Sequence, residues 1–203
     1  MDSYFAVSEN IIQTVLIILG SFAAGSIPFA FIITKIFSGK DIRKEGSGNP
    51  GATNVVRVLN GKYGLLTLIL DVLKGAVPVY YVISINPPLY LVHIVAISVV
   101  LGHDFTPFLK FKGGKGVAAS LGIFLVIDYV PTLIIVFIAF LLTSVFKFVS
   151  FGSVVASVSY PILLYVLGKT EYIWLAIILG LLIILSHRKN LRRLWYGQEK
   201  RSV

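Results

Sequence analysis

The chain of 203 residues contains no cysteine and few charged side chains. The absence of cysteine excludes disulfide bonds, thiolate metal sites and a thiol nucleophile. Only 13% of the residues are charged, whereas 57% are hydrophobic and the mean hydropathy is +0.90. A soluble domain is about 45–50% apolar, and so few charges do not solvate the outside of a soluble fold of this size. We therefore expect a single integral membrane domain that occupies residues 1–203.

The N-terminus lacks the features of a cleaved secretion signal. The first ten residues, MDSYFAVSEN, contain no lysine or arginine, and no A-x-A site follows the first apolar run. A secretion signal carries both a basic start and a small-residue cleavage site. We therefore expect the first apolar run to remain as a membrane span.

Carboxylates are scarce in the polar segments. Asp41, Glu45, Asp104 and Glu199 are spread over three separate stretches, without the spacing of metal ligands. A two-metal phosphotransferase is therefore disfavoured, and we expect no metal and no cofactor. The paired aspartates of the CDP-alcohol phosphotransferases are absent, and no histidine is followed five residues later by aspartate, as in the H-x4-D acyltransferases.

Long apolar runs predict an all-α membrane protein. They cover residues 11–37, 65–85, 89–101, 117–146, 151–167 and 172–186. Gly25, Ser26 and Pro28 interrupt the first run. The run 117–146 contains Asp128 near its middle, so it forms either one long kinked helix or two short helices.

The distribution of positive charge selects between these alternatives. Two helices give seven spans and place four basic segments on one side of the membrane, residues 38–64, 102–116, 147–150 and 187–203. That side then carries every lysine and arginine except Lys74 and Lys169, as expected for the cytoplasmic side. We predict about seven transmembrane helices, some of them short, with the N-terminus outside and the C-terminus inside.

The first polar segment, residues 39–64, predicts a short interfacial helix. Asn49 followed by Pro50 is typical of a helix N-cap and first turn, and Asn60-Gly61 is typical of a helix end. The helix between them should have about ten residues.

Five polar or glycine residues of this segment are candidates for anion binding. Asn54 and Arg57 are three apart and share one helix face. Ser47, Gly48 and Asn49 precede the helix N-terminus, where backbone N–H groups attract anions. Plain helix capping by Ser47 and lipid headgroup contact by Arg57 would account for the segment equally well.

The second polar segment, residues 102–120, contains Gly113-Gly114-Lys115-Gly116 before an expected helix start at Val117. Glycines let the backbone approach a ligand closely, so successive N–H groups are expected to form an anion nest at the helix N-terminus. Lys112 and Lys115 add positive charge. This is not a Walker loop, because glycine follows the lysine where serine or threonine is required. The alternative is an ordinary basic loop on the inner leaflet.

The third polar segment covers residues 186–199. If the last helix continues, His187 and Asn190 share one of its faces. The neighbouring arginines and lysine fit a positive flank that stops translocation, but such a flank explains neither that pair nor Glu199.

Three polar residues outside these motifs also need a role. Asp71 and Lys74 lie three apart inside a span, where charges are costly, so we expect either a structural ion pair or a pair that lines the site. His103, which follows Gly102, is expected to orient the second segment. Together, three basic, glycine-bearing segments on one face favour phosphate-bearing ligands.

The chain resembles the bacterial acyl-phosphate:glycerol-3-phosphate acyltransferases over essentially its whole length. The matching motifs, in order, are SGNPGATN with Arg57, DVLKG at 71–75, GH at 102–103, FKGGKGVA at 111–118, HRxN from His187, Arg193-Leu194, Gly197 and Glu199. Ala119 departs from a usual threonine, which puts in doubt only a hydroxyl contact at that position.

The resemblance implies an enzyme of phospholipid synthesis. It would transfer a fatty acyl group from acyl phosphate to the 1-hydroxyl of glycerol 3-phosphate, and release 1-acylglycerol 3-phosphate and phosphate. It would act at the cytoplasmic face of the bacterial inner membrane, among membrane lipids, without nucleic acid or an obligate protein partner.

The resemblance also assigns residues. The catalytic group is Ser47, Arg57, Lys115, His187, Asn190 and Glu199. The substrate- and phosphate-binding group is Gly48, Asn49, Asn54, Lys112, Gly113, Gly114, Gly116 and Arg193. Asp71, Lys74 and His103 would support the site.

Two other functions compete with the enzyme. A transporter for phosphorylated solutes suits the intramembrane charges, but the polar groups gather on one side and no internal repeat is visible. A lipid-binding scaffold without chemistry leaves Ser47, His187 and Asn190 unexplained.

Overall fold

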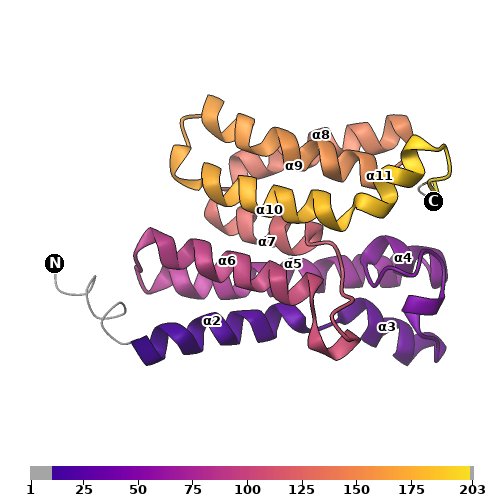
Figure 1. Ribbon diagram of the computed structural model, residues 1–203, viewed down its shortest axis with the longest axis horizontal. Helices are drawn as coiled ribbons and strands as arrows, with labels where there is room; N and C mark the ends of the chain where they lie inside the picture. Colours follow the sequence, from indigo (N-terminus) through magenta and orange to yellow (C-terminus); the bar gives the residue numbers. More distant parts are fainter. Residues whose placement is uncertain (1–10, 202–203) are drawn as a thin grey trace.

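The computed structural model describes residues 11–201, and this part of the chain contains helices and no strand (Figure 1). The α-helices are α2 Ile11–Ser26, α3 Phe29–Ser38, α4 Ala52–Val58, α5 Gly61–Ser84, α6 Leu89–Asp104, α7 Val117–Ile127, α8 Tyr129–Phe146, α9 Val149–Val166, α10 Ile173–Ser186 and α11 Arg188–Trp195. Three short 3-10 turns are η1 Ile42–Lys44, η2 Pro107–Leu109 and η3 Thr170–Tyr172. The all-α prediction is confirmed.

Five segments are long and apolar enough to cross a membrane. They are Ile11–Ser38, Gly61–Ser84, Leu89–Leu109, Tyr129–Phe146 and Val149–Val166. The bent pair of α10 and α11 makes a sixth. Helix α7 has 11 residues and rises only about 16 Å, so it spans about half of the hydrocarbon layer. Seven spans and their orientation stay predictions.

The expected breaks in the apolar runs occur where polar and proline residues interrupt them. Pro28 separates α2 from α3. Asp128 separates α7 from α8, and its carboxylate accepts a hydrogen bond from the Val130 N–H at 3.2 Å as the N-cap of α8. The run 117–146 therefore forms two helices, as its charge pattern predicted.

The short helix in the first polar segment differs from its prediction. Its N-cap is Gly51 rather than Asn49, and α4 has seven residues instead of ten. The reason is a tight turn in which the Gly51 N–H donates to the Asn49 carbonyl at 3.0 Å. Asn60 does not end α4 but caps the next helix, since its side chain accepts from the Tyr63 N–H.

Close helix packing sets the position of α7. Helix α2 packs along α6, α5 packs along α7, and α8, α9 and α10 form the other half of the bundle (Figure 1). A Cβ at Gly75 would collide with the Ala119 carbonyl, so only glycine lets the backbones of α5 and α7 approach this closely. The start of α7 and the basic loop before it are thereby held near α4.

Candidate active site

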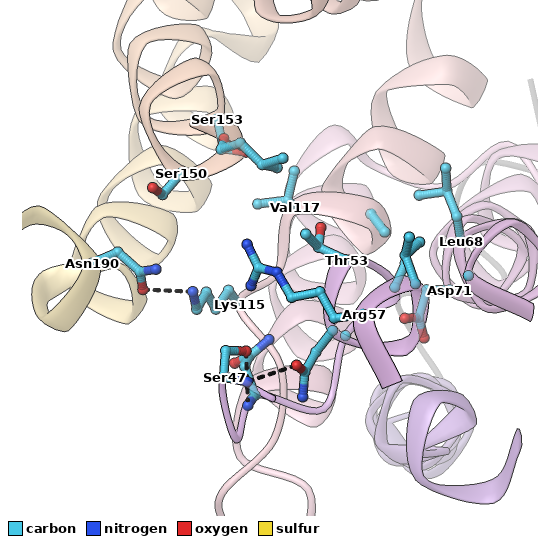
Figure 2. Close-up of a pocket in the computed structure, with 18 of the residues that line it drawn as sticks. Ser47, Thr53, Arg57, Leu68, Asp71, Lys115, Val117, Ser150, Ser153 and Asn190 are labelled. Carbon is cyan, nitrogen blue, oxygen red and sulfur yellow. Dashed lines mark hydrogen bonds between the residues drawn. The ribbon is translucent and has the colours of Figure 1, made fainter. Parts of the chain in front are cut away.

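A cavity of about 530 Å³ lies where the three polar segments meet (Figure 2). Its polar wall comes from all three segments, from α5, from α9 and from the C-terminal tail: Ser47, Asn49, Thr53, Asn54, Arg57, Asp71, His103, Lys115, Ser150, Ser153, His187, Asn190, Glu199 and Lys200. Every residue of the predicted catalytic group lines this one cavity. The expected convergence of distant segments is therefore present.

Five side chains form a hydrogen-bonded network on one wall of the cavity. The Lys115 ammonium donates to Asn190 Oδ1 at 2.6 Å, and Asn190 Nδ2 donates to Glu199 Oε1 at 2.6 Å. Glu199 also accepts from Arg193 Nε at 2.8 Å and from Ser150 Oγ at 3.1 Å. The network joins the second segment, the third segment and α9, and Figure 2 shows its link between Lys115 and Asn190.

The environment of this network shifts two pKa values. Burial lowers the pKa of Lys115 to about 8; Glu199 opposes the shift, and Arg193 and Arg57 add to it. Partial burial acts to raise the pKa of Glu199, but hydrogen bonds from Asn190 and Arg193 outweigh it and hold that pKa below its usual value. At neutral pH the cavity wall thus carries a lysine cation and a glutamate anion.

A bend in the chain turns His187 and Asn190 toward the cavity. The axes of α10 and α11 differ by 59° at His187, so the helix does not continue straight as the sequence suggested. His187 is buried, and its Nδ1 lies 2.8 Å from the Ile183 carbonyl. A carbonyl oxygen only accepts, so the neutral ring carries its proton on Nδ1 and leaves the Nε2 lone pair free.

Asn54 supports the Ser47 loop. Its Oδ1 accepts from the Ser47 N–H at 2.8 Å. Its Nδ2 donates to the Ile42 carbonyl at 3.3 Å and to the Glu45 carbonyl at 3.0 Å. Both amide protons are therefore used within the loop, and phosphate binding by Asn54 stays a prediction. The buried amide fixes the position of Ser47 at the cavity wall.

Arg57 connects the first segment to the C-terminal tail. Its Nη2 donates to the carbonyls of Lys200 at 3.3 Å and Arg201 at 3.2 Å. In the opposite direction, the Lys200 ammonium donates a hydrogen bond to the Gly46 carbonyl at 2.8 Å. In Figure 2 the side chains of Arg57 and Lys115 extend from different elements into the same space, so two cations face the cavity.

Two N–H groups of the predicted anion nest are used inside the protein. The Gly113 N–H donates to the Asp104 carbonyl at 2.9 Å, and the Gly114 N–H donates to the His103 carbonyl at 3.0 Å. These two N–H groups therefore satisfy the C-terminal end of α6 and are not available to an anion. Several other predicted residues also lie outside the cavity lining: Gly48, Lys74, Lys112, Gly116 and Arg193.

The intramembrane charges form a structural ion pair beside the cavity. Lys74 Nζ lies 2.8 Å from Asp71 Oδ1, and both side chains are almost fully buried. Lys74 also donates to the Ile27 carbonyl at 2.7 Å, at the break between α2 and α3. Of the two expected roles, Lys74 has the structural one, while Asp71 and His103 line the cavity.

The side chains that could bind a metal ion are not clustered in the described part of the chain. Within residues 11–201, no three His, Asp or Glu side chains lie close enough together to hold a metal ion. Three cationic side chains line the cavity: Arg57, Lys115 and Lys200. The Lys200 ammonium bonds to the Gly46 carbonyl, so Lys115 and Arg57 are the groups best placed to balance phosphate charge there.

Residues 15–197 match the sequence model of a known protein family, the glycerol-3-phosphate acyltransferases. The chain belongs to this family. It is 44% identical to a glycerol-3-phosphate acyltransferase of Endomicrobium trichonymphae over 89% of this chain and 91% of the relative. It is 42% identical to glycerol-3-phosphate acyltransferase 2 of Thermotoga maritima over 91% and 93% of the two chains.

Two solved structures of an integral membrane relative have the same fold. The glycerol 3-phosphate form of PlsY (YgiH) aligns with a TM-score of 0.89 at 35% identity, over 94% of this chain and 96% of that chain. The lysophosphatidic acid form aligns with a TM-score of 0.86 at 34% identity. The all-helical membrane fold and the acyltransferase class are thus shown, and the transporter and scaffold alternatives are set aside.

The His103 side chain packs so close to the backbone at position 114 that only glycine fits there. A Cβ at Gly114 would collide with the His103 imidazole, and Gly114 is not among the positive-φ glycines. Because His103 is buried and has little room to move, we expect Gly114→Ala to destabilise this acyltransferase by about 1–3 kcal/mol and to displace Lys115. Thermal unfolding and steady-state kinetics measure the two effects.

The double variant Gly114→Ala/His103→Ala tests that reason. Removing the imidazole makes room for the new methyl group, so the two changes should be less than additive in unfolding free energy. Full additivity would place the strain elsewhere in the loop.

Three residues on the cavity wall were not predicted from the sequence: Thr53, Ser150 and Ser153. Ser150 is the last residue of the basic segment 147–150, which the charge pattern placed on the cytoplasmic side, so its position along the chain was a usable signal. Its bond to Glu199, 49 residues away, was not predictable from local pattern.

Proposed function

We propose that this family member transfers a fatty acyl group from acyl phosphate to the 1-hydroxyl of sn-glycerol 3-phosphate. The products are 1-acylglycerol 3-phosphate, which is lysophosphatidic acid, and phosphate, in the first acylation of phospholipid synthesis. Acylation of glycerol 3-phosphate follows from the family. The observation that supports the donor is a two-part cavity, cationic at one end and apolar at the other.

The apolar part is a second cavity of about 130 Å³ between α7, α8, α9 and α10. It shares Val117, Leu121 and Ser153 with the polar cavity, so the two cavities adjoin at these residues. A fatty acyl phosphate has a matching shape: its chain fills the apolar part, and its phosphate faces Lys115 and Arg57. Apolar burial and charge pairing then act on one donor molecule.

The reaction requires little activation by the protein, because an acyl phosphate is already a mixed anhydride. The 1-hydroxyl oxygen forms a bond to the acyl carbon, the bond from that carbon to the phosphate oxygen breaks, and phosphate leaves with the electron pair. The hydroxyl proton passes to His187 Nε2 or to the departing phosphate; the free Nε2 lone pair supports the first route. Lys115 and Arg57 hold phosphate charge, and Ser47 and Asn190 position the reactants.

A direct transfer predicts that no acyl-enzyme accumulates. The chain has no cysteine, and Ser47 lies in a loop before a short helix rather than in the strand-to-helix turn of a nucleophile elbow. Incubation with radiolabelled acyl phosphate in the absence of glycerol 3-phosphate should leave no stable label on the protein. Label on Ser47 that disappears in Ser47→Ala would instead establish a two-step serine mechanism.

The donor is tested with purified protein in detergent. Palmitoyl phosphate, palmitoyl-CoA and palmitoyl acyl carrier protein are offered in turn with glycerol 3-phosphate, and lysophosphatidic acid is quantified. We expect product from the acyl phosphate alone. Equal or greater product from either thioester would contradict the proposed donor. An assay without vesicles also measures chemistry independently of transport.

The buried lysine predicts an alkaline limit to activity. Burial lowers the pKa of Lys115 to about 8, so the free enzyme loses this cation as the pH rises through that value. Phosphate monoesters titrate near pH ~6 and therefore do not change charge in this range. We expect kcat/KM to fall above pH 8, and Lys115→Arg to move the limit upward because guanidinium stays charged. An unchanged limit in Lys115→Arg would assign it to another group.

We further propose that the site faces the cytoplasm of a bacterial cell at the inner membrane. The basic loops and the tail around the cavity support this orientation through the preference of positive charge for the cytoplasmic side. The short α7 supports a site below the membrane surface, where a lipid-soluble donor and a water-soluble acceptor can meet.

A further inference from the structure

Three side chains, Phe124, Thr132 and Tyr160, form the floor of the apolar cavity, which is the end farthest from the polar cavity. Tyr160 of α9 is buried, and its ring packs edge-on against Phe124 of α7 with centroids 4.6 Å apart. The Tyr160 hydroxyl lies 2.8 Å from Thr132 Oγ1 on α8. Three helices therefore contribute to one barrier across the cavity.

The hydrogen bonds of the floor have a defined direction. Thr132 Oγ1 donates its single proton to the Asp128 carbonyl at 2.7 Å, so Tyr160 is the donor in its bond to Thr132. Asp128 is in turn the N-cap of α8 and pairs with Lys169 at 2.9 Å. The hydroxyls of the floor are satisfied by each other and by the backbone, so the Tyr160 ring that lines the cavity is anchored at its hydroxyl end.

The floor lies at a fixed depth below the polar cavity. On α9, Ser153 lines both cavities and Tyr160 follows seven residues later, a rise of about 10 Å. On α7, Val117 lines both cavities and Phe124 also follows seven residues later. Two independent helices thus place the floor at the same distance from the reacting end.

We propose that Tyr160, held by Thr132 and Phe124, is the specificity-determining residue that limits the length of the acyl chain this enzyme accepts. The inference rests on the proposed function, because it takes the acyl chain of the donor as the occupant of the apolar cavity. A chain that ends at the ring buries all its methylenes. A longer chain must displace an anchored tyrosine or leave methylenes outside, so each additional methylene stops contributing to binding.

Two substitutions should shift the preference in opposite directions. Tyr160→Ala removes the ring and deepens the cavity. Ala156→Leu fills it one helical turn above the floor, because Ala156 lines the same cavity on α9. Ile162→Ala is the matched control: Ile162 lies on α9 near Tyr160 but is 61% exposed on the outer face.

The experiment measures kcat/KM for a graded series of saturated acyl phosphates, from lauroyl to stearoyl, with each purified variant. A pocket discriminates by about tenfold or more for a misplaced methylene. We expect the ratio of stearoyl to myristoyl phosphate to rise about tenfold in Tyr160→Ala and to fall about tenfold in Ala156→Leu. In Ile162→Ala the ratio should stay at the wild-type value. KM for glycerol 3-phosphate should not change in any variant.

The outcomes distinguish failure of the proposed role of Tyr160 from failure of the proposed acyl phosphate donor. If wild-type protein forms no lysophosphatidic acid from any acyl phosphate, the proposed donor is wrong. If wild-type protein is active but neither variant alters the ratio, the donor stands and the role of Tyr160 is overturned. Should Tyr160→Ala fail to fold, Ala156→Leu decides alone, since it tests the same cavity from the opposite direction.

Discussion

Replacement of Lys115 by methionine is expected to lower kcat/KM by about 10²–10³-fold, since one preorganised donor at a developing charge has this effect. Methionine keeps the length and apolar stem of the side chain and removes the cation. The Lys115 ammonium reaches the cavity from the start of α7 and is held by Asn190 at 2.6 Å. Its charge acts in a partly buried site, where electrostatic interactions are stronger than in bulk water.

The loop that carries Lys115 offers its own control. Lys112 lies three residues earlier, is exposed, and does not line the cavity. Lys112→Met removes the same charge from the same loop and should leave kcat/KM within about twofold, because an exposed charge is screened by salt. Similar losses in both variants would show that only the overall positive potential of the loop matters. Thermal unfolding of each variant shows whether the loss is catalytic or structural.

Replacement of Arg57 by alanine is expected to slow turnover by about ten- to a hundredfold or more, since a charge-assisted hydrogen bond contributes about 1.5–3 kcal/mol. The guanidinium donates to two carbonyls of the C-terminal tail, so the same change should also release that tail. Hydrogen exchange over residues 197–201 should therefore become faster in Arg57→Ala.

Two further variants test this assignment. Arg57→Lys keeps the charge but not the planar fork, so it should recover part of the activity and little of the tail protection. Arg192→Ala, an exposed arginine of α11, should change neither quantity. Wild-type turnover in Arg57→Ala with faster exchange of the tail would limit Arg57 to a structural role.

Local pattern was sufficient for most of the helices. Apolar runs located α2, α5, α6, α9 and α10 within a few residues, because a helix in a membrane must present apolar side chains over its whole length. Pro28 and Asp128 interrupted two of these runs where the helices in fact break. Local pattern misplaced α4, because an Asn-Pro-Gly turn and a helix N-cap use the same residue types.

Local motifs also identified the residues at the cavity but not all of their roles. The motifs shared with the acyltransferase family selected six catalytic candidates, and all six line the cavity: Ser47, Arg57, Lys115, His187, Asn190 and Glu199. Gly113 and Gly114 were selected for the same reason. Their N–H groups instead bond to the end of α6, because a backbone donor beside a helix C-terminus pairs with the carbonyls left free there.

The sequence by itself determined the membrane class, the helical content and the side on which polar residues gather, because each depends on composition and short-range period. Only the tertiary structure decided which polar groups remain free to act. Asn54 uses its whole amide on its own loop, whereas Asn190 joins Lys115, 75 residues away, to Glu199. The two asparagines are chemically identical. They differ because the start of α7 and the bend between α10 and α11 meet at the polar cavity and bring partners to Asn190, whereas Asn54 finds its partners within its own loop.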